Sequence, residues 1–266
     1  MTRRNDARGA SEITIFGLHP VREAIRSSHV DVLGVRHDRV RPSDALRGLL
    51  HDVRSAGVEV EPVSRSVLDR SGGAARHDQG VAARVRLRRI APVENFVESA
   101  KGRAARRPLR LVALDGVTNS QNVGMVVRSV VGTGLDGLLW PRIGQPWVNG
   151  LVVRAASGTI FDCPIVLCES LPVGLAALQA AGFVAIGLEA GATSSLFEVE
   201  TPHRAVFVLG SESRGLSEQV AAMLDRRVAI PMAGPAESLN VAVAAGLVCF
   251  HAAGLLQPAP ARADAG

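Results

Sequence analysis

Aromatic residues are scarce in this chain of 266 residues: they make up 3% of it, and tyrosine is absent. A hydrophobic core must therefore be built from valine, leucine, isoleucine and alanine. Because 47% of the residues are hydrophobic and 21% are charged, the composition excludes an intrinsically disordered chain. The length is typical of one large domain or two ordinary ones.

Long apolar runs are also missing. No stretch reaches the roughly 18 uncharged apolar residues of a membrane-spanning helix, and MTRRNDARGASE at the N-terminus lacks the apolar segment of a signal peptide. Cysteine is limited to Cys163, Cys168 and Cys249, with no histidine at a metal-ligand spacing. Cys163 and Cys168 are near enough in sequence to share a metal, but small buried thiols explain them more simply. We expect a cytoplasmic protein with neither a membrane span nor a metal site.

Lysine is almost absent, and the basic residues are unevenly placed. Lys101 is the one lysine of the sequence. Residues 1–110 hold 22 basic and 13 acidic residues, a net charge of +9, whereas residues 111–266 hold 8 and 12, a net charge of −4. A base composition that favours arginine codons accounts for the choice of arginine but not for this asymmetry. We expect the first half to bind a polyanion and the second half to carry the chemistry.

Apolar runs and helical patterns alternate, which is typical of an α/β fold with a mainly parallel sheet. The first half predicts strands at 13–17, 31–36, 58–64 and 79–88, and helices at 19–28, 43–57 and 65–70, with Ser43 as an N-cap. The second half predicts strands at 109–117, 136–141, 163–168, 183–189, 205–210 and 226–232, and helices at 122–133, 149–158, 171–181, 217–225 and 238–256.

The segment 91–108 is rich in arginine and weak in apolar periodicity, so we expect a linker there. It would join a substrate-binding domain at 13–90 to a catalytic domain at 109–257. Disordered tails are expected at 1–12 and 258–266.

The strand predicted at 79–88 places three arginines on one face. Arg84, Arg86 and Arg88 alternate with apolar residues, and alternate side chains of a strand point to the same side. The pattern fits a solvated sheet face and an RNA-binding surface equally well.

One glycine run imitates a dinucleotide-binding motif. Gly132, Gly134 and Gly137 satisfy G-x-G-x-x-G, but they follow a predicted helix and precede a strand. A phosphate-binding turn needs the reverse order. We therefore interpret these glycines as a helix terminus.

Three segments place small and polar residues where predicted strands end. They are LDGVTNSQNVGMVVRSV (114–130), VLGSESRGLS (208–217) and IPMAGPAESLNVAVAAG (230–246). Ligands of α/β proteins bind at the carboxyl ends of strands, where glycine and proline let the backbone approach a planar base. Singly, each segment has a structural explanation, such as a helix cap or a turn. Together, in this order and spacing, they are far more specific.

With these segments the chain resembles the SpoU branch of the SPOUT RNA 2′-O-ribose methyltransferases. The motifs are NVGxxxRS (122–129), LGSExxGLS (209–217) and IPMxGxxESLNVxVAxG (230–246), within a match over 109–256. FGLHPVREAI (16–25) and DQGVAA (78–83) resemble the substrate-binding domain of members that modify guanosine in 23S rRNA. The resemblance implies an α/β C-terminal domain with a deep trefoil knot, preceded by a small α/β domain similar to ribosomal protein L30e.

The resemblance also implies a cofactor and its site. S-adenosylmethionine would lie against Leu209, Gly210, Ile230, Met232, Ser238 and Leu239. Two positions depart from the usual pattern: Asn119-Ser120 stands where Asp-Pro is common, and Ala242 where many members have serine. Neither departure removes an implied catalytic group.

The implied catalytic residue is Arg128, with Asn122 orienting the ribose or the arginine and with Glu212, Ser238 and Asn240 at the remaining polar positions. A guanidinium stays charged in proteins, since its pKa exceeds about 12. We therefore expect Arg128 to hold the neighbouring phosphate and the developing alkoxide rather than to accept the proton. Glu212 is expected to fix Arg128 through a bidentate pair.

The candidate RNA contacts in the first domain are His19, Arg22, Arg84, Arg86 and Arg88. The last helix is apolar on almost every side, which fits either core burial or a homodimer interface, and the resemblance favours the homodimer. The prediction is S-adenosylmethionine-dependent 2′-O-ribose methylation of RNA, with a guanosine of 23S rRNA as target. The alternatives are the same reaction on tRNA, or a non-catalytic RNA-binding factor in ribosome assembly.

Overall fold

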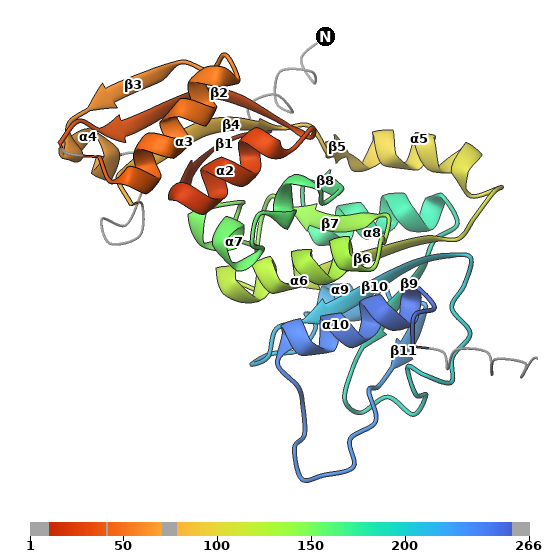
Figure 1. Cartoon of the computed structure of the whole chain (residues 1–266). Helices are drawn as coiled ribbons and strands as arrows, with labels where there is room; N and C mark the ends of the chain where they lie inside the picture. The colour runs from red at the N-terminus through yellow and green to blue at the C-terminus, as the bar shows by residue number, and fades with distance from the viewer. Residues whose placement is uncertain (1–10, 41, 71–78, 257–266) are drawn as a thin grey trace, which may run out of the picture. The chain divides into compact units, whose positions relative to one another are not determined.

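The computed structural model of the chain describes residues 11–40, 42–70 and 79–256. Contacts divide the chain into two compact units. The first comprises 1–92, 119–128 and 146–165, and the second comprises 93–118, 129–145 and 166–266. Each is built from strands and helices (Figure 1), so the predicted α/β class is confirmed.

The predicted tails fall mostly outside the described residues. All of 258–266 and the first ten residues of 1–12 lie there. Glu12, however, is already the first residue of a strand, so the N-terminal element begins one residue earlier than the sequence pattern indicates.

The first unit contains a four-stranded sheet with the order β1-β4-β2-β3. Its strands are β1 (Glu12–Phe16), β2 (Val30–Asp38), β3 (Val60–Val63) and β4 (Val81–Leu87). The strand β4 runs antiparallel to β1 and β2, and β3 is parallel to β2. The helices are α2 (Leu18–Arg26), α3 (Asp44–Ser55) and α4 (Arg65–Arg70).

The two faces of this sheet differ. Ile13, Ile15, Ala83 and Val85 are almost fully buried on the same face by strand alternation, and α2 and α3 cover one face of the sheet (Figure 1). The residues between them point to the other face, and among the described residues Leu68 of α4 covers one end of it. Arg36 and Arg84 on this second face are exposed, so within the described part of the chain the rest of the face is open to solvent.

Helix α3 begins where the sequence predicts. The Ser43 side chain accepts a hydrogen bond from the Leu46 backbone N–H at 3.2 Å, which is the N-cap interaction.

The larger sheet has the strand order β11-β9-β10-β6-β7-β8-β5. Its members are β5 (Ile90–Pro92), β6 (Leu109–Asp115), β7 (Gly137–Pro141), β8 (Ile165–Cys168), β9 (Val184–Leu188), β10 (Arg204–Gly210) and β11 (Arg226–Val228). The pairs β6–β7, β6–β10, β9–β10 and β9–β11 are parallel. Because β7 is buried at every residue and β6 at all but its last, they are central strands of a covered parallel sheet.

The remaining helices are α5 (Val93–Arg103), α6 (Ser120–Gly132), α7 (Gly150–Ala155), α8 (Leu171–Ala180), α9 (Glu218–Ala221) and α10 (Val241–Ala252), with a 3₁₀ turn at Thr159–Phe161. The segment predicted as a linker is mostly helical: α5 buries Val93, Phe96 and Ala100 in the core of the second unit. The spacing of these three residues is helical, but the surrounding charges hide it.

Helix α6 starts earlier than the position predicted near Asn122. The Asn119 side chain caps it by accepting from the Gln121 backbone N–H at 2.9 Å. Gly124 then lets α7 approach closely, since a Cβ there would lie 2.5 Å from that of Ala155. At the other end, Gly134 has a φ of +67° and follows the helix, which confirms that the glycine run is a helix terminus.

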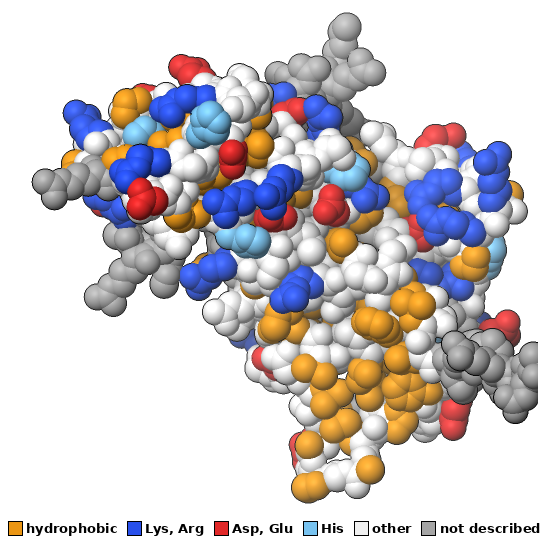
Figure 2. Space-filling view, in the orientation of Figure 1, with side chains coloured by type: hydrophobic (Ala, Val, Ile, Leu, Met, Phe, Trp, Pro, Cys, Tyr) orange, Lys and Arg blue, Asp and Glu red, His pale blue; other side chains and the backbone are white. Residues whose placement is uncertain are grey.

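Helix α10 starts later than predicted, at Val241. Asn240 is its N-cap, with its Oδ1 accepting from the Ala242 N–H at 2.9 Å, so Ser238 belongs to the preceding loop. The helix buries one side in the second unit, but Val243 is 54% and Phe250 is 42% exposed. Hydrophobic side chains gather over α10 and the loop before it (Figure 2).

Candidate active site

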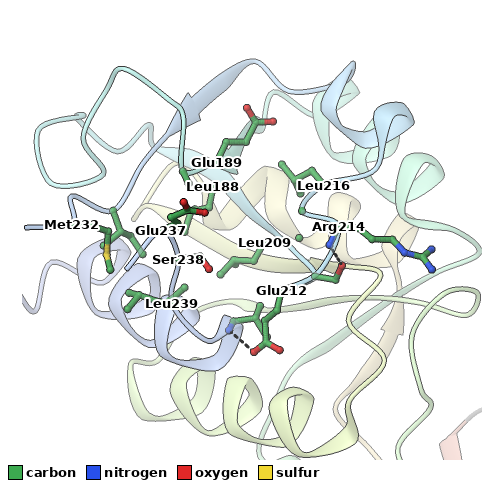
Figure 3. Close-up of a pocket in the computed structure, with 17 residues that line it drawn as sticks. Leu188, Glu189, Leu209, Glu212, Arg214, Leu216, Met232, Glu237, Ser238 and Leu239 are labelled. Atoms are coloured by element: carbon green, nitrogen blue, oxygen red, sulfur yellow. Dashed lines mark hydrogen bonds between the residues drawn. The ribbon is translucent and has the colours of Figure 1, made fainter. Parts of the chain in front are cut away.

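A cavity of about 410 Å³ lies in the second unit, at the carboxyl ends of β9 and β10. The motif segments 208–217 and 230–246 both line it, although 28 residues separate Glu212 from Asn240. In Figure 3, Ser238 and Leu239 of the later segment lie across the cavity from Leu216 of the earlier one. The structure places all six predicted cofactor residues in this lining: Leu209, Gly210, Ile230, Met232, Ser238 and Leu239.

Gly210 ends β10 at a position where only glycine fits. A Cβ there would lie 2.1 Å from the Gly215 carbonyl carbon. The chain folds back on itself because Ser211 and Gly215 exchange two backbone hydrogen bonds, at 3.0 and 2.8 Å. Gly215 has a φ of +65°, which side chains disfavour. The two glycines thus form a tight loop that presents backbone groups to the cavity.

Glu212 joins the two motif segments. Its Oε1 accepts a hydrogen bond from the Val241 backbone N–H at 3.1 Å and another from the Asn240 side-chain amide. The carboxylate therefore lies at the N-terminus of α10, where a negative charge is favoured. Arg128 belongs to the first unit, so its predicted pair with Glu212 stays a prediction.

A second contact joins the motif segment 114–130 to the segment 208–217. The Asp115 carboxylate at the end of β6 accepts from the Ser217 backbone N–H at 2.6 Å. This contact ties the end of the 208–217 segment to the neighbouring strand, and it is not predictable from the sequence.

Sequence reasoning also missed the end of β9. Leu188, Glu189 and Ala190 line the cavity, and the Glu189 carboxylate lies 3.4 Å from Nε of Arg227. With Glu212 and Glu237, three carboxylates lie at the cavity against two arginines, Arg214 of the lining and Arg227, which pairs with Glu189, so one negative charge remains in excess. The excess of negative charge favours a ligand that carries positive charge. The only available signal was the position of Glu189 after a predicted strand.

Asn122 and Arg128 both lie on α6, in the part of that helix assigned to the first unit. Asn122 is 5% exposed, and Arg128 is exposed. Neither belongs to the described residues that line the cavity. Their catalytic roles remain predictions.

The three predicted arginines, two on β4 and Arg88 directly after it, are not equivalent. Arg86 pairs with Glu12 at 2.5 Å, and the Nε of Arg88 donates to Asp31 at 2.9 Å. The hydrogen bond from Arg88 lowers the pKa of Asp31 below its usual value. Strands β1 and β2 thus place an acid beside two of the three arginines.

Arg84 differs from these two, since it is exposed and has no acidic partner among the described residues. The other predicted RNA contacts lie on α2, where His19 is exposed and Arg22 is partly buried.

The described part of the chain holds no group of three or more His, Cys, Asp or Glu side chains that could bind a metal ion. All three cysteines are buried free thiols, and burial raises the pKa of Cys168 and of Cys249 to about 12. Within the same residues, no helix has both the length and the apolar character for crossing a bilayer.

Family models match both parts of the chain. Residues 109–250 match the SpoU rRNA Methylase family, and residues 14–91 match the RNA 2′-O ribose methyltransferase substrate binding family.

Two curated relatives cover most of the chain. The chain is 33% identical over 239 residues to a 23S rRNA (guanosine-2′-O-)-methyltransferase, RlmB, from Burkholderia sp, which covers 90% of this chain and 94% of that one. It is 34% identical over 237 residues to a protein of Mycolicibacterium gilvum described as an uncharacterized tRNA/rRNA methyltransferase, with 88% and 74% covered.

The fold is similar to that of a solved relative. The SpoU methyltransferase AviRb from Streptomyces viridochromogenes, in complex with AdoMet, superposes with a TM-score of 0.74 at 25% identity, covering 95% of this chain and 93% of that one. Since one family model matches more than half of the chain and both relatives span most of it, the chain belongs to the SpoU rRNA methylase family.

Proposed function

We propose that this protein transfers the methyl group of S-adenosylmethionine to a ribose 2′-hydroxyl of RNA. One observation carries the proposal: the segments LGSESRGLS and IPMAGPAESLN, distant in sequence, line one cavity at the carboxyl ends of parallel strands. The match to a SpoU methylase model and the likeness to AviRb, solved in complex with AdoMet, support the same reaction.

The cavity suits this cofactor in size and chemistry. Its volume of about 410 Å³ is within the range of small-molecule sites, about 300–1,000 Å³. Leu209, Ile230 and Leu239 offer an apolar surface for a planar base, and the Gly210 loop offers backbone polar groups. When bound, the cofactor supplies an electrophilic methyl group on a sulfonium centre. The surrounding carboxylates favour that positive charge.

The protein's own task is then to hold the ribose and stabilise the charge that develops on its oxygen. We assign Arg128 to the neighbouring phosphate and the nascent alkoxide, and Asn122 to orientation of the ribose or of Arg128. Because a guanidinium remains protonated, the hydroxyl proton passes to a phosphate oxygen or to water. Glu212 and Asn240 hold the start of α10, and Ser238 lies in the loop just before it. Positioning of this kind supplies a large part of the rate acceleration in group transfer.

A guanosine of 23S rRNA is the proposed target. The support is the name of the Burkholderia relative and the presence of a substrate-binding family match at 14–91. The tRNA/rRNA description of the Mycolicibacterium relative keeps tRNA as the second candidate. A non-catalytic assembly factor is the third, and it requires a cavity that does not bind the methyl donor.

The proposal also covers the oligomeric state, the detailed topology of the two domains and the location of the protein. We expect a homodimer in which Val243 and Phe250 of α10 lie against a second copy, since both are exposed on an apolar helix. We also expect the knotted C-terminal topology, the L30e-like first domain and a cytoplasmic location that the sequence implies.

The test is a pair of measurements on the purified full-length protein. Calorimetric titration with S-adenosylmethionine should show saturable binding, and incubation with radiolabelled donor and ribosomal RNA should label the RNA. Binding without transfer to ribosomal RNA or tRNA would contradict the catalytic assignment. No binding at all would leave the assembly factor as the supported function.

A further inference from the structure

The open face of the first unit's sheet carries three rows of side chains, each running across the strands. In two rows the charges are neutralised: Arg86 pairs with Glu12, and Nε of Arg36 lies 2.8 Å from Glu61. The middle row is different. It consists of Thr14 on β1, Arg84 on β4, Gly34 on β2 and Glu59 just before β3.

The register of the sheet defines this middle row. Arg84 is paired with Thr14 on one side and with Gly34 on the other. The Val35 N–H donates to the Glu59 carbonyl at 2.9 Å, so Glu59 lies beside Gly34. Ile13, Ile15, Ala83, Val85 and Val35 point into the core, so Thr14, Arg84 and Gly34 face solvent.

Gly34 leaves a gap between two charges. A Cβ at Gly34 would meet nothing within 4 Å, and a groove of about 190 Å³ opens there. Arg84 and Glu59 line it from either side, with backbones about 10 Å apart, or two strand spacings of about 4.8 Å each. Neither side chain has an oppositely charged partner in the described part of the chain.

We propose that this groove binds one unpaired guanine of the RNA substrate, a role that rests on the proposed function. Its volume is below the range of drug-sized ligands, about 300–1,000 Å³, so it suits a single ring system. Guanine carries acceptors O6 and N7 on one edge, which match the guanidinium of Arg84. Its N1–H and N2–H donors match the carboxylate of Glu59. Proteins read RNA sequence mainly on unpaired bases whose edges are exposed in this way.

The charge pattern favours guanine over the other bases. Adenine presents an amino donor where guanine has O6, so it would face Arg84 with the wrong group. A surface that only attracted phosphate would not need a carboxylate in the same row, because Glu59 repels the backbone. Recognition of a base edge accounts for both residues.

The probe for the test is a fluorescent single-stranded oligouridine with one central guanosine, and anisotropy is measured with the full-length protein. Gly34→Leu extends into the groove from a position where the added Cβ has no atom within 4 Å, and it should weaken binding about tenfold, the size of one good bidentate contact. Gly48→Leu, at an exposed position of α3 where an added Cβ also has no atom within 4 Å, should bind like the wild type. Circular dichroism checks that both variants fold.

A second variant tests the assigned base. Glu59→Gln should lose the preference for guanosine over inosine, which lacks the N2 amino group; the readout is the ratio of the two affinities, in which the effect of the lost charge on the RNA backbone cancels. Arg84→Ala should weaken binding of both probes, and Arg54→Ala, an equal charge change on α3, should not.

The outcomes separate the two proposals. If the wild type methylates RNA while Gly34→Leu and Glu59→Gln bind the guanosine probe normally, the groove assignment is wrong. If the groove variants lose guanosine binding while the wild type methylates no RNA, the guanine site stands and the proposed catalytic function fails.

Discussion

The Glu212 carboxylate accepts a hydrogen bond from the Val241 backbone N–H at 3.1 Å, and this contact joins the end of β10 to the start of α10. Both segments line the candidate cofactor cavity. One side chain therefore fixes the relative position of the two loops that shape it.

Removing this contact should weaken cofactor binding. Glu212→Ala leaves the Val241 N–H and the Asn240 amide without their acceptor, and a lost hydrogen bond of this kind costs about 1 kcal/mol or more. We expect S-adenosylmethionine affinity to fall about five- to tenfold in calorimetry, and the melting temperature to fall by only about 2–4 °C, the shift that 1 kcal/mol causes in a chain of about this size. Glu218→Ala, an exposed acid on α9, is the control. Equal affinities of the Glu212 variant and the wild type would contradict the linking role.

The tight loop at Gly210 predicts a steric effect. Gly210→Ala would place a Cβ 2.1 Å from the backbone of Gly215, which must shift. Cofactor binding should fall at least about tenfold, because a displaced loop no longer presents its backbone groups. Gly191→Ala has open space around its Cβ and should bind normally. A Gly210 variant with wild-type affinity would show that the loop does not contact the cofactor.

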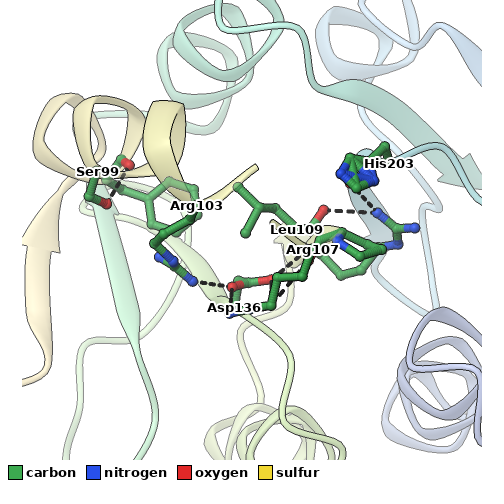
Figure 4. A network of polar contacts seen from close by, with 9 residues as sticks. Ser99, Arg103, Arg107, Leu109, Asp136 and His203 are labelled. Carbon is green, nitrogen blue, oxygen red and sulfur yellow. Dashed lines mark hydrogen bonds and ion pairs between the residues drawn. The ribbon is translucent and has the colours of Figure 1, made fainter. Parts of the chain in front are cut away.

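We predict that substitution of Asp136 lowers the stability of the protein rather than its binding of the cofactor. Its side chain is 2% exposed and binds Arg103 and Arg107, and its Oδ2 accepts from the Arg110 backbone N–H at 2.8 Å (Figure 4). Asp136→Asn removes the charge that both arginines pair with, although their own exposure of 38% and 51% limits the loss.

We expect the free energy of unfolding to fall by about 2 kcal/mol, as measured by urea denaturation. The control is Glu98→Gln, which breaks an exposed pair with Lys101 and should change the value by less than about 0.5 kcal/mol. A similar loss in the two variants would mean that burial of Asp136 adds nothing.

We predict that the folding stability of the protein depends on pH through His251. Its pKa is lowered because burial disfavours the charged ring, whose Nε2 lies 3.4 Å from the Thr201 hydroxyl. The unfolded chain then binds a proton at a higher pH than the folded chain does, so stability rises with pH. The free energy of unfolding should therefore carry no penalty from His251 above a pH of about 6.5, and it should decline below that pH.

The matched variant is His251→Gln, which cannot be protonated. Its melting temperature should decline less than that of the wild type between about pH 7 and pH 5. Identical pH profiles of the two proteins would contradict the lowered pKa.

The sequence predicts those features that depend on local pattern. Strand alternation, the Ser43 cap and the motif segments around Gly210 and Leu239 all follow from neighbours along the chain. The helix α5 was hidden because its apolar residues, such as Phe96, are dispersed among charges.

Contacts that depend on strand register cannot be predicted from neighbours along the chain. The pairs of Arg86 with Glu12 and of Arg88 with Asp31 depend on which strands become neighbours, and on the irregular register between Val32 and Gly34. Glu189 enters the cavity for the same reason, since β9 lies next to β10.

The central claim is methyl transfer to a ribose oxygen, and nucleoside mass spectrometry after reaction tests it most directly. RNA incubated with the wild type and S-adenosylmethionine should yield a 2′-O-methylated nucleoside, guanosine for the proposed target. Arg128→Ala should bind the cofactor with nearly unchanged affinity and yield at least about a hundredfold less product, the usual size of a lost transition-state contact. A methyl group on a base, or full turnover by the Arg128 variant, would contradict this account.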